Sequence, residues 1–117
     1  MAQEMGKEDI YKKYIERSQN YINVFDGATR FFRGKRMDGN WESPFNPLAV
    51  GRAYTEATAW QYRFFVPHDV NGMIQLFGGK EEFVAALDDI FNTDAEIHGN
   101  LVDITGLIGQ YVHGNEP

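Results

Sequence analysis

The sequence predicts a mainly α-helical chain with long, aromatic-rich connections and one short hairpin. Three stretches repeat their apolar residues at the spacing of one helix face, and turn or breaker residues bound these stretches. The segments between them are rich in aromatic residues, glycine and proline. With 117 residues, of which 43% are hydrophobic and 15% aromatic, the chain can form one domain around a single core.

The N-terminal part is predicted to hold one amphipathic helix over residues 9–25. Apolar residues line one side of it, while lysine, glutamate and arginine lie on the other. The helix is expected to end before the turn dipeptide Asp26-Gly27. The stretch 31–47 carries glycine and proline among its aromatic residues. It is predicted to form a short hairpin or structured loop centred on Asp38-Gly39.

Residues 54–66 are almost all aromatic or apolar, so this segment is expected to be buried on most sides, whether it is helical or extended. Pro67 ends it, because proline has no backbone N–H to donate. The irregular stretch 94–110, rich in glycine and asparagine, is expected to form a connection without regular structure. Long connections of this kind inside a domain are typical of functional loops.

Two further helices are predicted between these segments. Asp69 caps the first, which runs to about residue 77 and stops at Gly78-Gly79, and the second covers about residues 80–91. The residues expected to face inward are Val70, Met73, Ile74 and Phe77 in the first helix, and Phe83, Ala86, Leu87, Ile90 and Phe91 in the second.

The charge balance and residue usage exclude several classes of function. A net charge of -6 and a pI near 4.9 argue against a nucleic-acid partner, which normally needs a basic patch. The absence of cysteine excludes disulfides, thiolate metal sites and a cysteine nucleophile. No apolar run approaches the roughly 18 residues that a membrane span needs, so no membrane partner is expected.

Glu56 is the first candidate for chemistry. It is an isolated carboxylate among Tyr54, Trp60 and Tyr62, and an apolar setting favours the protonated form that a general acid requires. The other interpretation is a surface glutamate near a helix start, where negative charge is favourable. The residue pattern alone favours this second interpretation.

Two polar groups further along the chain are weaker candidates. His68 and Asp69 are adjacent and could serve proton transfer, but a structural histidine and a helix cap are the favoured interpretations. Residues 109–116 place amides, an imidazole and a carboxylate in a glycine-flanked loop. Such donors suit a hard cation such as calcium, or the hydroxyls of a polyol, and a polar surface turn is an equal alternative.

Nine short motifs run in order along nearly the whole chain. They are NYINVFD at 20–26, FFRG at 31–34, DGNW at 38–41, PFNP at 44–47, YTE at 54–56, AWQY at 59–62, VPHDV at 66–70, GLIGQY at 106–111 and HGNEP at 113–117. Taken together, they resemble the catalytic-domain sequence of glycoside hydrolase family 92, the calcium-dependent exo-α-mannosidases. Any one motif is a weak signal, whereas the ordered set is specific.

The resemblance implies a fold and a place within a larger protein. The family's catalytic domain is an (α/α)6 toroid joined to an N-terminal β-sandwich, so residues 1–117 would form a fragment of that toroid. The family also implies a periplasmic or extracellular location in a bacterium, which the sequence by itself leaves undetermined. An excised arc of a toroid would expose helix faces that its neighbours cover, and self-association of the isolated chain is therefore expected.

The resemblance also implies an activity and the residues that support it. The activity is that of an inverting exo-α-mannosidase, of α-1,2 type, which removes terminal α-mannose from glycans with Glu56 as general acid. In the complete enzyme a calcium ion would bind the sugar's O2 and O3 and favour a distorted ring. The implied substrate contacts are Trp60, His68, Asp69 and His113, and the implied calcium ligands are Gln61, Asn115 and Glu116.

Two departures from the family limit what this chain is expected to do. Ala57-Thr58 stands where the family has Gly-Asn, which puts one backbone approach and one amide contact in doubt. The family's base aspartates lie beyond residue 117, so the isolated chain is expected to be inactive. The alternatives are a stand-alone helical module that binds carbohydrate or protein without catalysis, and a folded fragment with no function of its own. Tight, saturable binding of mannose by the chain alone would favour the module.

Overall fold

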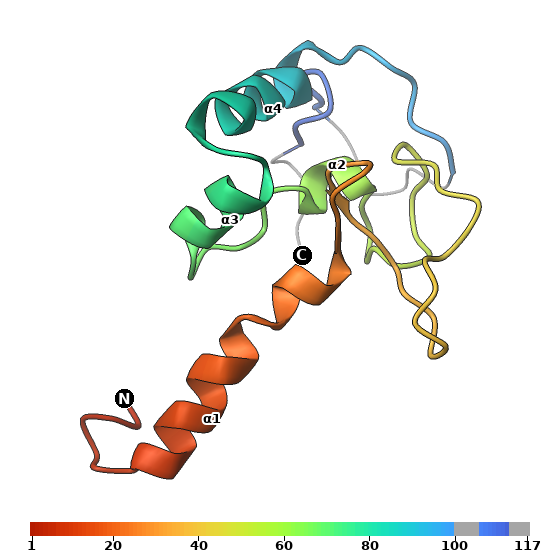
Figure 1. Ribbon diagram of the computed structural model, residues 1–117. Helices are drawn as coiled ribbons and strands as arrows, with labels where there is room; N and C mark the ends of the chain where they lie inside the picture. The colour runs from red at the N-terminus through yellow and green to blue at the C-terminus, as the bar shows by residue number, and fades with distance from the viewer. Residues whose placement is uncertain (100–105, 113–117) are drawn as a thin grey trace.

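The computed structural model describes residues 1–99 and 106–112 (Figure 1). Their order is α1 (Glu8–Ser18), the 3-10 helix η1 (Asn20–Val24), β1 (Phe25–Asp26), β2 (Phe31–Phe32), α2 (Ala59–Tyr62), α3 (Val70–Leu76) and α4 (Lys80–Asn92). The described part is therefore mainly helical with one small antiparallel hairpin, as the sequence predicts. None of its helices has the length and apolar character that crossing a bilayer demands.

The N-terminal helix stands away from the rest of the chain. Figure 1 shows α1 projecting from the body formed by the other helices and the loops, and none of its residues is buried. The sequence predicts one helix over 9–25, but the α-helix ends at Ser18 and the chain continues as η1. Phe25 leaves the helical path because its side chain is buried and its backbone pairs with Phe32.

Two turns follow one another where the sequence predicts one hairpin. Strands β1 and β2 pair around a turn at 27–30, and the sequence analysis placed a turn at Asp26-Gly27 but predicted no strands around it. At the predicted turn Asp38-Gly39, Lys35 and Trp41 form an antiparallel bridge, and the Asp38 carboxylate accepts a hydrogen bond from the backbone N–H of Asn40 at 3.0 Å. The predicted turn is therefore confirmed, but the two paired strands, β1 and β2, lie before it in the sequence.

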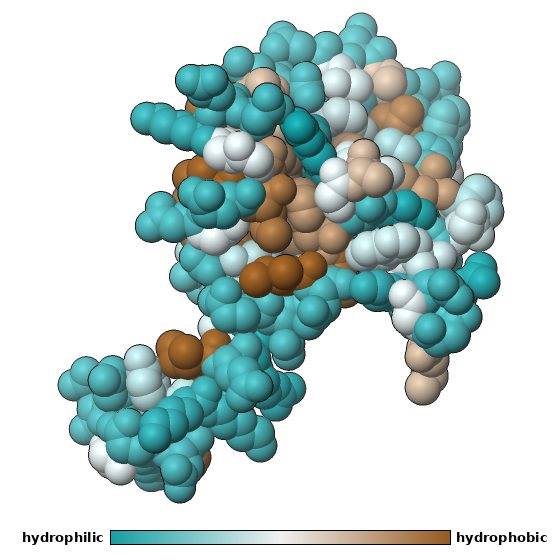
Figure 2. Space-filling model, viewed as in Figure 1, coloured by the Kyte–Doolittle hydropathy of each residue, from teal (hydrophilic) through white to brown (hydrophobic). Residues whose placement is uncertain are grey.

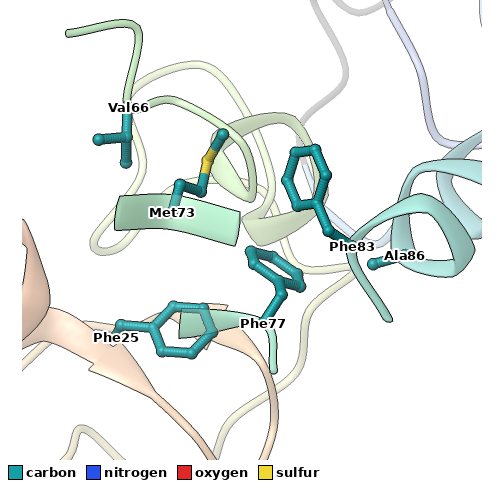
Figure 3. Close-up of a cluster of buried hydrophobic side chains, with 6 residues drawn as sticks. All are labelled: Phe25, Val66, Met73, Phe77, Phe83 and Ala86. Atoms are coloured by element: carbon teal, nitrogen blue, oxygen red, sulfur yellow. The ribbon is translucent and has the colours of Figure 1, made fainter. Parts of the chain in front are cut away.

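Two hydrophobic clusters form the core. The first cluster, drawn in Figure 3, joins β1 to α3 and α4 and consists of Phe25, Val66, Met73, Phe77, Phe83 and Ala86. Its centre is Phe77, whose ring lies 5.3 Å from that of Phe25 and 5.4 Å from that of Phe83. The second cluster joins β2, α2 and α4 and consists of Phe31, Ala59, Trp60 and Ile90. Aromatic pairs at these distances stabilise a core beyond the area that they bury.

Arg63 lies between the two clusters. It is 5% exposed, and its guanidinium lies 4.5 Å from the ring centroid of Phe31 in the second cluster and 5.6 Å from that of Phe77 in the first. Its Nε donates to the carbonyl oxygen of Arg30 at 3.2 Å, and the carboxylate of Asp89 is 3.8 Å away. Cation–π interactions stabilise a desolvated guanidinium between aromatic rings, and here they connect the two clusters of the core.

Most of the residues that were predicted to face inward do so. Met73 in α3, Phe77 directly after it, and Phe83, Ala86 and Ile90 in α4 are buried, whereas Ile74 and Leu87 are half-buried. The prediction is wrong for Val70, which is 49% exposed, and for Phe91, which is 48% exposed. Val70 lies in the first turn of α3, ahead of the buried stripe. The Phe91 ring packs on Tyr111 at 5.2 Å instead of entering a cluster.

Large apolar side chains also lie on the surface. Figure 2 shows hydrophobic side chains gathered in the middle of the visible face, and α1 and η1 add a second exposed set. The exposed apolar residues of these two helices are Ile10, Tyr14, Ile15, Ile22 and Val24. Apolar surface of this extent is typical of a face that another protein segment covers.

We expect the 117-residue chain to self-associate in solution because of this exposed apolar surface. Sedimentation velocity should show an average sedimentation coefficient that rises with protein concentration. Replacing Tyr14 and Ile15 together by lysine should move the distribution toward the monomer, since these side chains are 60% and 52% exposed. Met37→Lys, at a fully exposed turn, is the control and should leave association unchanged. A sharp monomer at every concentration would contradict the expectation.

Candidate functional site

Glu56 lies in a closed loop ahead of α2. The N–H of Gly51 donates to the carbonyl oxygen of Ala57 at 3.1 Å, which brings the two ends of the loop together. Glu56 has a φ of 52°, a left-handed conformation that is uncommon for a residue with a side chain, and it is exposed. The prediction that this carboxylate is buried is therefore wrong. Its neighbours Tyr54 and Trp60 pack on the second cluster and leave Glu56 at the surface.

A complete capping box begins α2 directly after this loop. The Oε1 atom of Gln61 accepts hydrogen bonds from the backbone N–H of Thr58 at 2.7 Å and from its hydroxyl at 2.6 Å. The Thr58 hydroxyl in turn accepts from the N–H of Trp60 at 3.2 Å. Such a box satisfies backbone donors that a helix start leaves unpaired, and it fixes Thr58, which is completely buried, two residues after Glu56.

Trp60, an implied substrate contact, is a core residue in the structure. Its side chain belongs to the second cluster, is 9% exposed, and meets the Phe31 ring edge-on at 5.1 Å. The guanidinium of Arg63 lies 4.9 Å from its ring centroid. Its buried indole Nε1 has no hydrogen-bond partner within residues 1–99 and 106–112. Protein contacts therefore occupy the ring that the resemblance assigns to a sugar.

His68 and Asp69 lie at the start of α3 and make structural contacts. The Asp69 carboxylate accepts the N–H of Gly72 at 2.9 Å, which confirms the predicted helix cap, and it also accepts the hydroxyl of Tyr21 at 2.8 Å. The bonds from Tyr21 and Gly72 hold the pKa of Asp69 below its ordinary value. Burial, followed by this carboxylate, raises the pKa of Tyr21 to about 12. His68 Nε2 is 2.8 Å from the carbonyl oxygen of Ser18, so His68 attaches the start of α3 to the end of α1 and Asp69 attaches it to η1.

A pocket of about 270 Å³ lies against the loop that carries Glu56. The sequence analysis did not single out its lining residues as site residues. Its wall combines a cation, a carboxylate, an amide and aromatic rings, a mixture that suits the hydroxyls and apolar faces of a sugar. The lining includes Arg33, Glu42, Phe45, Asn46, Arg52 and Tyr54. Four of these residues, Arg33, Phe45, Asn46 and Tyr54, belong to the motifs FFRG, PFNP and YTE, so the motif order was the signal that could have identified them.

Arg33 fixes one wall of this pocket. Its Nη1 donates to the Asp26 carboxylate at 2.7 Å, its Nη2 donates to the carbonyl oxygen of Glu42 at 2.8 Å, and its guanidinium lies 4.4 Å from the ring centroid of Phe45. Asp26 also accepts from the Thr29 hydroxyl at 2.8 Å. Burial raises the pKa of Asp26, but the hydrogen bonds from Arg33 and Thr29 outweigh it and hold the pKa below the usual range.

The remaining predicted site residues divide into one that the structure places and three that it does not. His113, Asn115 and Glu116 lie outside the described residues. Gln61 is described, and its Nε2 donates to the carbonyl oxygen of Gln110 at 2.6 Å, three residues before His113. In the described part of the chain, no three histidine or carboxylate side chains gather in a way that would hold a metal ion.

The chain is similar to solved α-mannosidases over nearly its whole length. The family model described as the glycosyl hydrolase family 92 catalytic domain matches residues 1–117. A family 92 α-mannosidase from Bacteroides thetaiotaomicron, solved in complex with mannoimidazole, is 36% identical with a TM-score of 0.86. That match covers 98% of this chain and 16% of the other. A second structure of the same α-mannosidase is 38% identical with a TM-score of 0.81, covering 97% of this chain and 14% of the other.

Two more distant relatives match in the same way. An inverting mannosidase of family 92 from Bacteroides thetaiotaomicron VPI-5482 is 34% identical with a TM-score of 0.74, covering 77% of this chain and 12% of its own length. An uncharacterized secreted glycosidase from Arthroderma benhamiae is 32% identical over 119 residues, which is 82% of this chain and 15% of the glycosidase. The chain therefore spans only a small part of each relative.

Proposed function

Since the chain belongs to glycosyl hydrolase family 92, we propose that its parent protein is an inverting exo-α-mannosidase that removes terminal α-mannose from glycans. The observation that carries the proposal is the match to an α-mannosidase solved with mannoimidazole, which extends over 98% of the chain. Residues 1–117 would then be one part of an (α/α)6 toroid whose remainder, with a β-sandwich, completes the site. An α-1,2 linkage is the proposed substrate.

Glu56 is the proposed general acid. Inversion requires one carboxylic acid that protonates the leaving oxygen and one carboxylate that activates water, roughly 6.5–9.5 Å apart. A carboxyl on a surface loop beside a pocket is accessible to the glycosidic oxygen of a bound glycan, and its proton passes to that oxygen as the bond to the anomeric carbon breaks. The proposed base lies beyond residue 117, so the isolated chain would lack half of the acid–base pair.

The proposal also includes calcium in the complete enzyme. Asn115 and Glu116 carry the oxygen ligands that calcium prefers, whereas the Oε1 atom of Gln61 already accepts two hydrogen bonds. A calcium ion would contribute binding and orientation of the sugar hydroxyls. His113, together with Trp60, His68 and Asp69, remains a proposed substrate contact. Among these, His68 is exposed, whereas Trp60 would have to be uncovered first.

Hydrolysis by a chain extended through the whole toroid and the β-sandwich tests the proposal. In calcium-containing buffer the extended protein should release mannose from an α-1,2-linked mannobiose, and proton NMR should detect the β-anomer first. The 117-residue chain should release none. An extended protein that hydrolyses no α-mannoside, or that releases the α-anomer first, would refute the proposal. Activity of the 117-residue chain would show that the general base lies within residues 1–117.

A further inference from the structure

We infer that Gln61 is a positioning residue and not a calcium ligand: it ties the loop that carries Glu56 to the segment that leads into residues 113–117. The inference concerns the site proposed above and rests on that function where it concerns catalysis. The contact itself, between a side chain of α2 and a main-chain carbonyl 49 residues later, is independent of function.

Both ends of the Gln61 amide make hydrogen bonds, and its oxygen uses both lone pairs. A carbonyl oxygen accepts through two lone pairs, and Oε1 receives one hydrogen bond from the Thr58 N–H at 2.7 Å and one from the Thr58 hydroxyl at 2.6 Å. The other end of the same amide, Nε2, donates to the carbonyl oxygen of Gln110 at 2.6 Å. A calcium ion at Oε1 would displace at least one bond of the capping box, so the geometry favours a structural role for the oxygen and a tethering role for the nitrogen.

The receiving end of the tether is itself held firmly. Gln110 is 1% exposed, and its backbone N–H donates to the carbonyl oxygen of Ile90 in the last turn of α4 at 2.6 Å. Its side-chain Nε2 donates to the carbonyl oxygens of Thr93 at 3.1 Å and Ala95 at 2.8 Å. One buried residue therefore satisfies the C-terminal end of α4 and receives the bond from α2.

Gly109 and Tyr111 keep this segment against α4. Gly109 has a φ of 59°, and a Cβ there would lie 2.6 Å from the carbonyl oxygen of Ile90, so a side chain would push the two backbones apart. The Tyr111 ring packs on Phe91 at 5.2 Å. The segment has little freedom to move along α4, and the Gln61 bond then sets its position relative to α2.

The tether connects the two stretches to which the proposed chemistry is assigned. Glu56 precedes Thr58, the partner of the Gln61 oxygen, by two residues, and His113 follows Gln110 by three. A shift between these stretches would change the distance from the acid to the sugar. Misplacement of a reacting group by about 1 Å is enough to lower a rate by about 10²-fold.

Gln61→Glu in the complete protein separates the two roles of the residue. Glutamate serves a capping box as well as glutamine does, so the bonds from Thr58 are retained, but the Nε2 donor is lost and a carboxylate oxygen faces the Gln110 carbonyl. Loss of a positioning residue should weaken calcium binding by about 10–100-fold, measured by titration calorimetry of the apo-protein. A calcium ligand would behave in the opposite way, because added negative charge favours the cation. Binding that is unchanged or tighter would overturn the inference.

A measurement on the 117-residue chain tests the tether without reference to function. Hydrogen exchange of the amides of residues 108–112 should be faster in Gln61→Glu than in the unmodified chain. Thr29→Ala, which removes one hydrogen bond to Asp26 elsewhere, is the matched control and should leave that exchange unchanged. Equal exchange in both variants would exclude the tether even if the complete protein is an active mannosidase. Faster exchange in the Gln61→Glu variant of the 117-residue chain, together with a complete protein that has no mannosidase activity, would retain the tether and refute only the proposed function.

Discussion

Replacing Glu56 by glutamine in the complete enzyme is expected to lower kcat/KM for an α-mannobiose by about 10²–10⁴-fold, which is the range of general acid catalysis. Glutamine keeps the shape of the side chain and removes the proton that the leaving oxygen needs. Glutamine has the same shape and size as glutamate at this left-handed position, so the comparison isolates the carboxyl group. Initial rates of mannose release measure the effect.

The leaving group gives this prediction its control. A dinitrophenyl mannoside has a leaving group that needs no proton, so its hydrolysis should be reduced far less by Glu56→Gln. Glu81→Gln, an exposed carboxylate in the first turn of α4, should leave both rates unchanged. Equal losses for the two substrates would show that Glu56 supports binding or folding instead, and unchanged rates would remove it from the acid role.

Asp26→Ala is expected to destabilise the 117-residue chain by about 3–5 kcal/mol, the typical result of leaving one partner of a buried ion pair alone. The side chains of Asp26 and Arg33 are 9% and 12% exposed, and they are 2.7 Å apart. Removing Asp26 leaves the guanidinium of Arg33 without its carboxylate. Urea denaturation followed by circular dichroism measures the change, and a loss below about 1 kcal/mol would place the pair among surface-like ion pairs.

The double variant and the pH dependence identify the cause. Asp26→Ala combined with Arg33→Met should be less destabilised than Asp26→Ala alone, since no unpaired charge remains. The pKa of Asp26 is lowered in the folded chain. The carboxylate therefore stabilises the fold fully above the pKa of an unfolded aspartate, about 3.9, and this contribution disappears as the pH falls through the lower folded-state pKa. The difference between the unmodified chain and Asp26→Ala should shrink in the same window.

Helices α3 and α4 were predictable because their signals are local, whereas the sequence left the segment of α2 open between helical and extended. Apolar spacing gives α3 and α4, the cap at Asp69 gives the start of α3, and Gly78-Gly79 gives its end. The division of the first helix at Ser18 was not predictable in this way. It depends on the burial of Phe25 against Phe77, a partner 52 residues later, and long-range packing overrides local spacing.

The surroundings of the candidate site residues could not be predicted from the sequence. Residue pattern and motif order single out Glu56 and Gln61, but not the exposure of the first or the bond from the second to Gln110. The pocket lined by Arg33 was missed for the same reason, because its wall brings together residues from separate stretches between 33 and 54. Contacts between distant segments follow from the fold, and composition does not encode them.

The position of Arg63 has a consequence for how the chain unfolds. Because one guanidinium contacts rings of both clusters, opening either cluster releases Arg63 and weakens the cation–π contacts that it makes in the other. The two clusters then cannot open at separate free energies, and the hairpin, α2, α3 and α4 behave as one cooperative unit. The projecting α1 buries no residue, so its N-terminal turns can fray without disturbing that unit, whereas its last residue, Ser18, contacts His68.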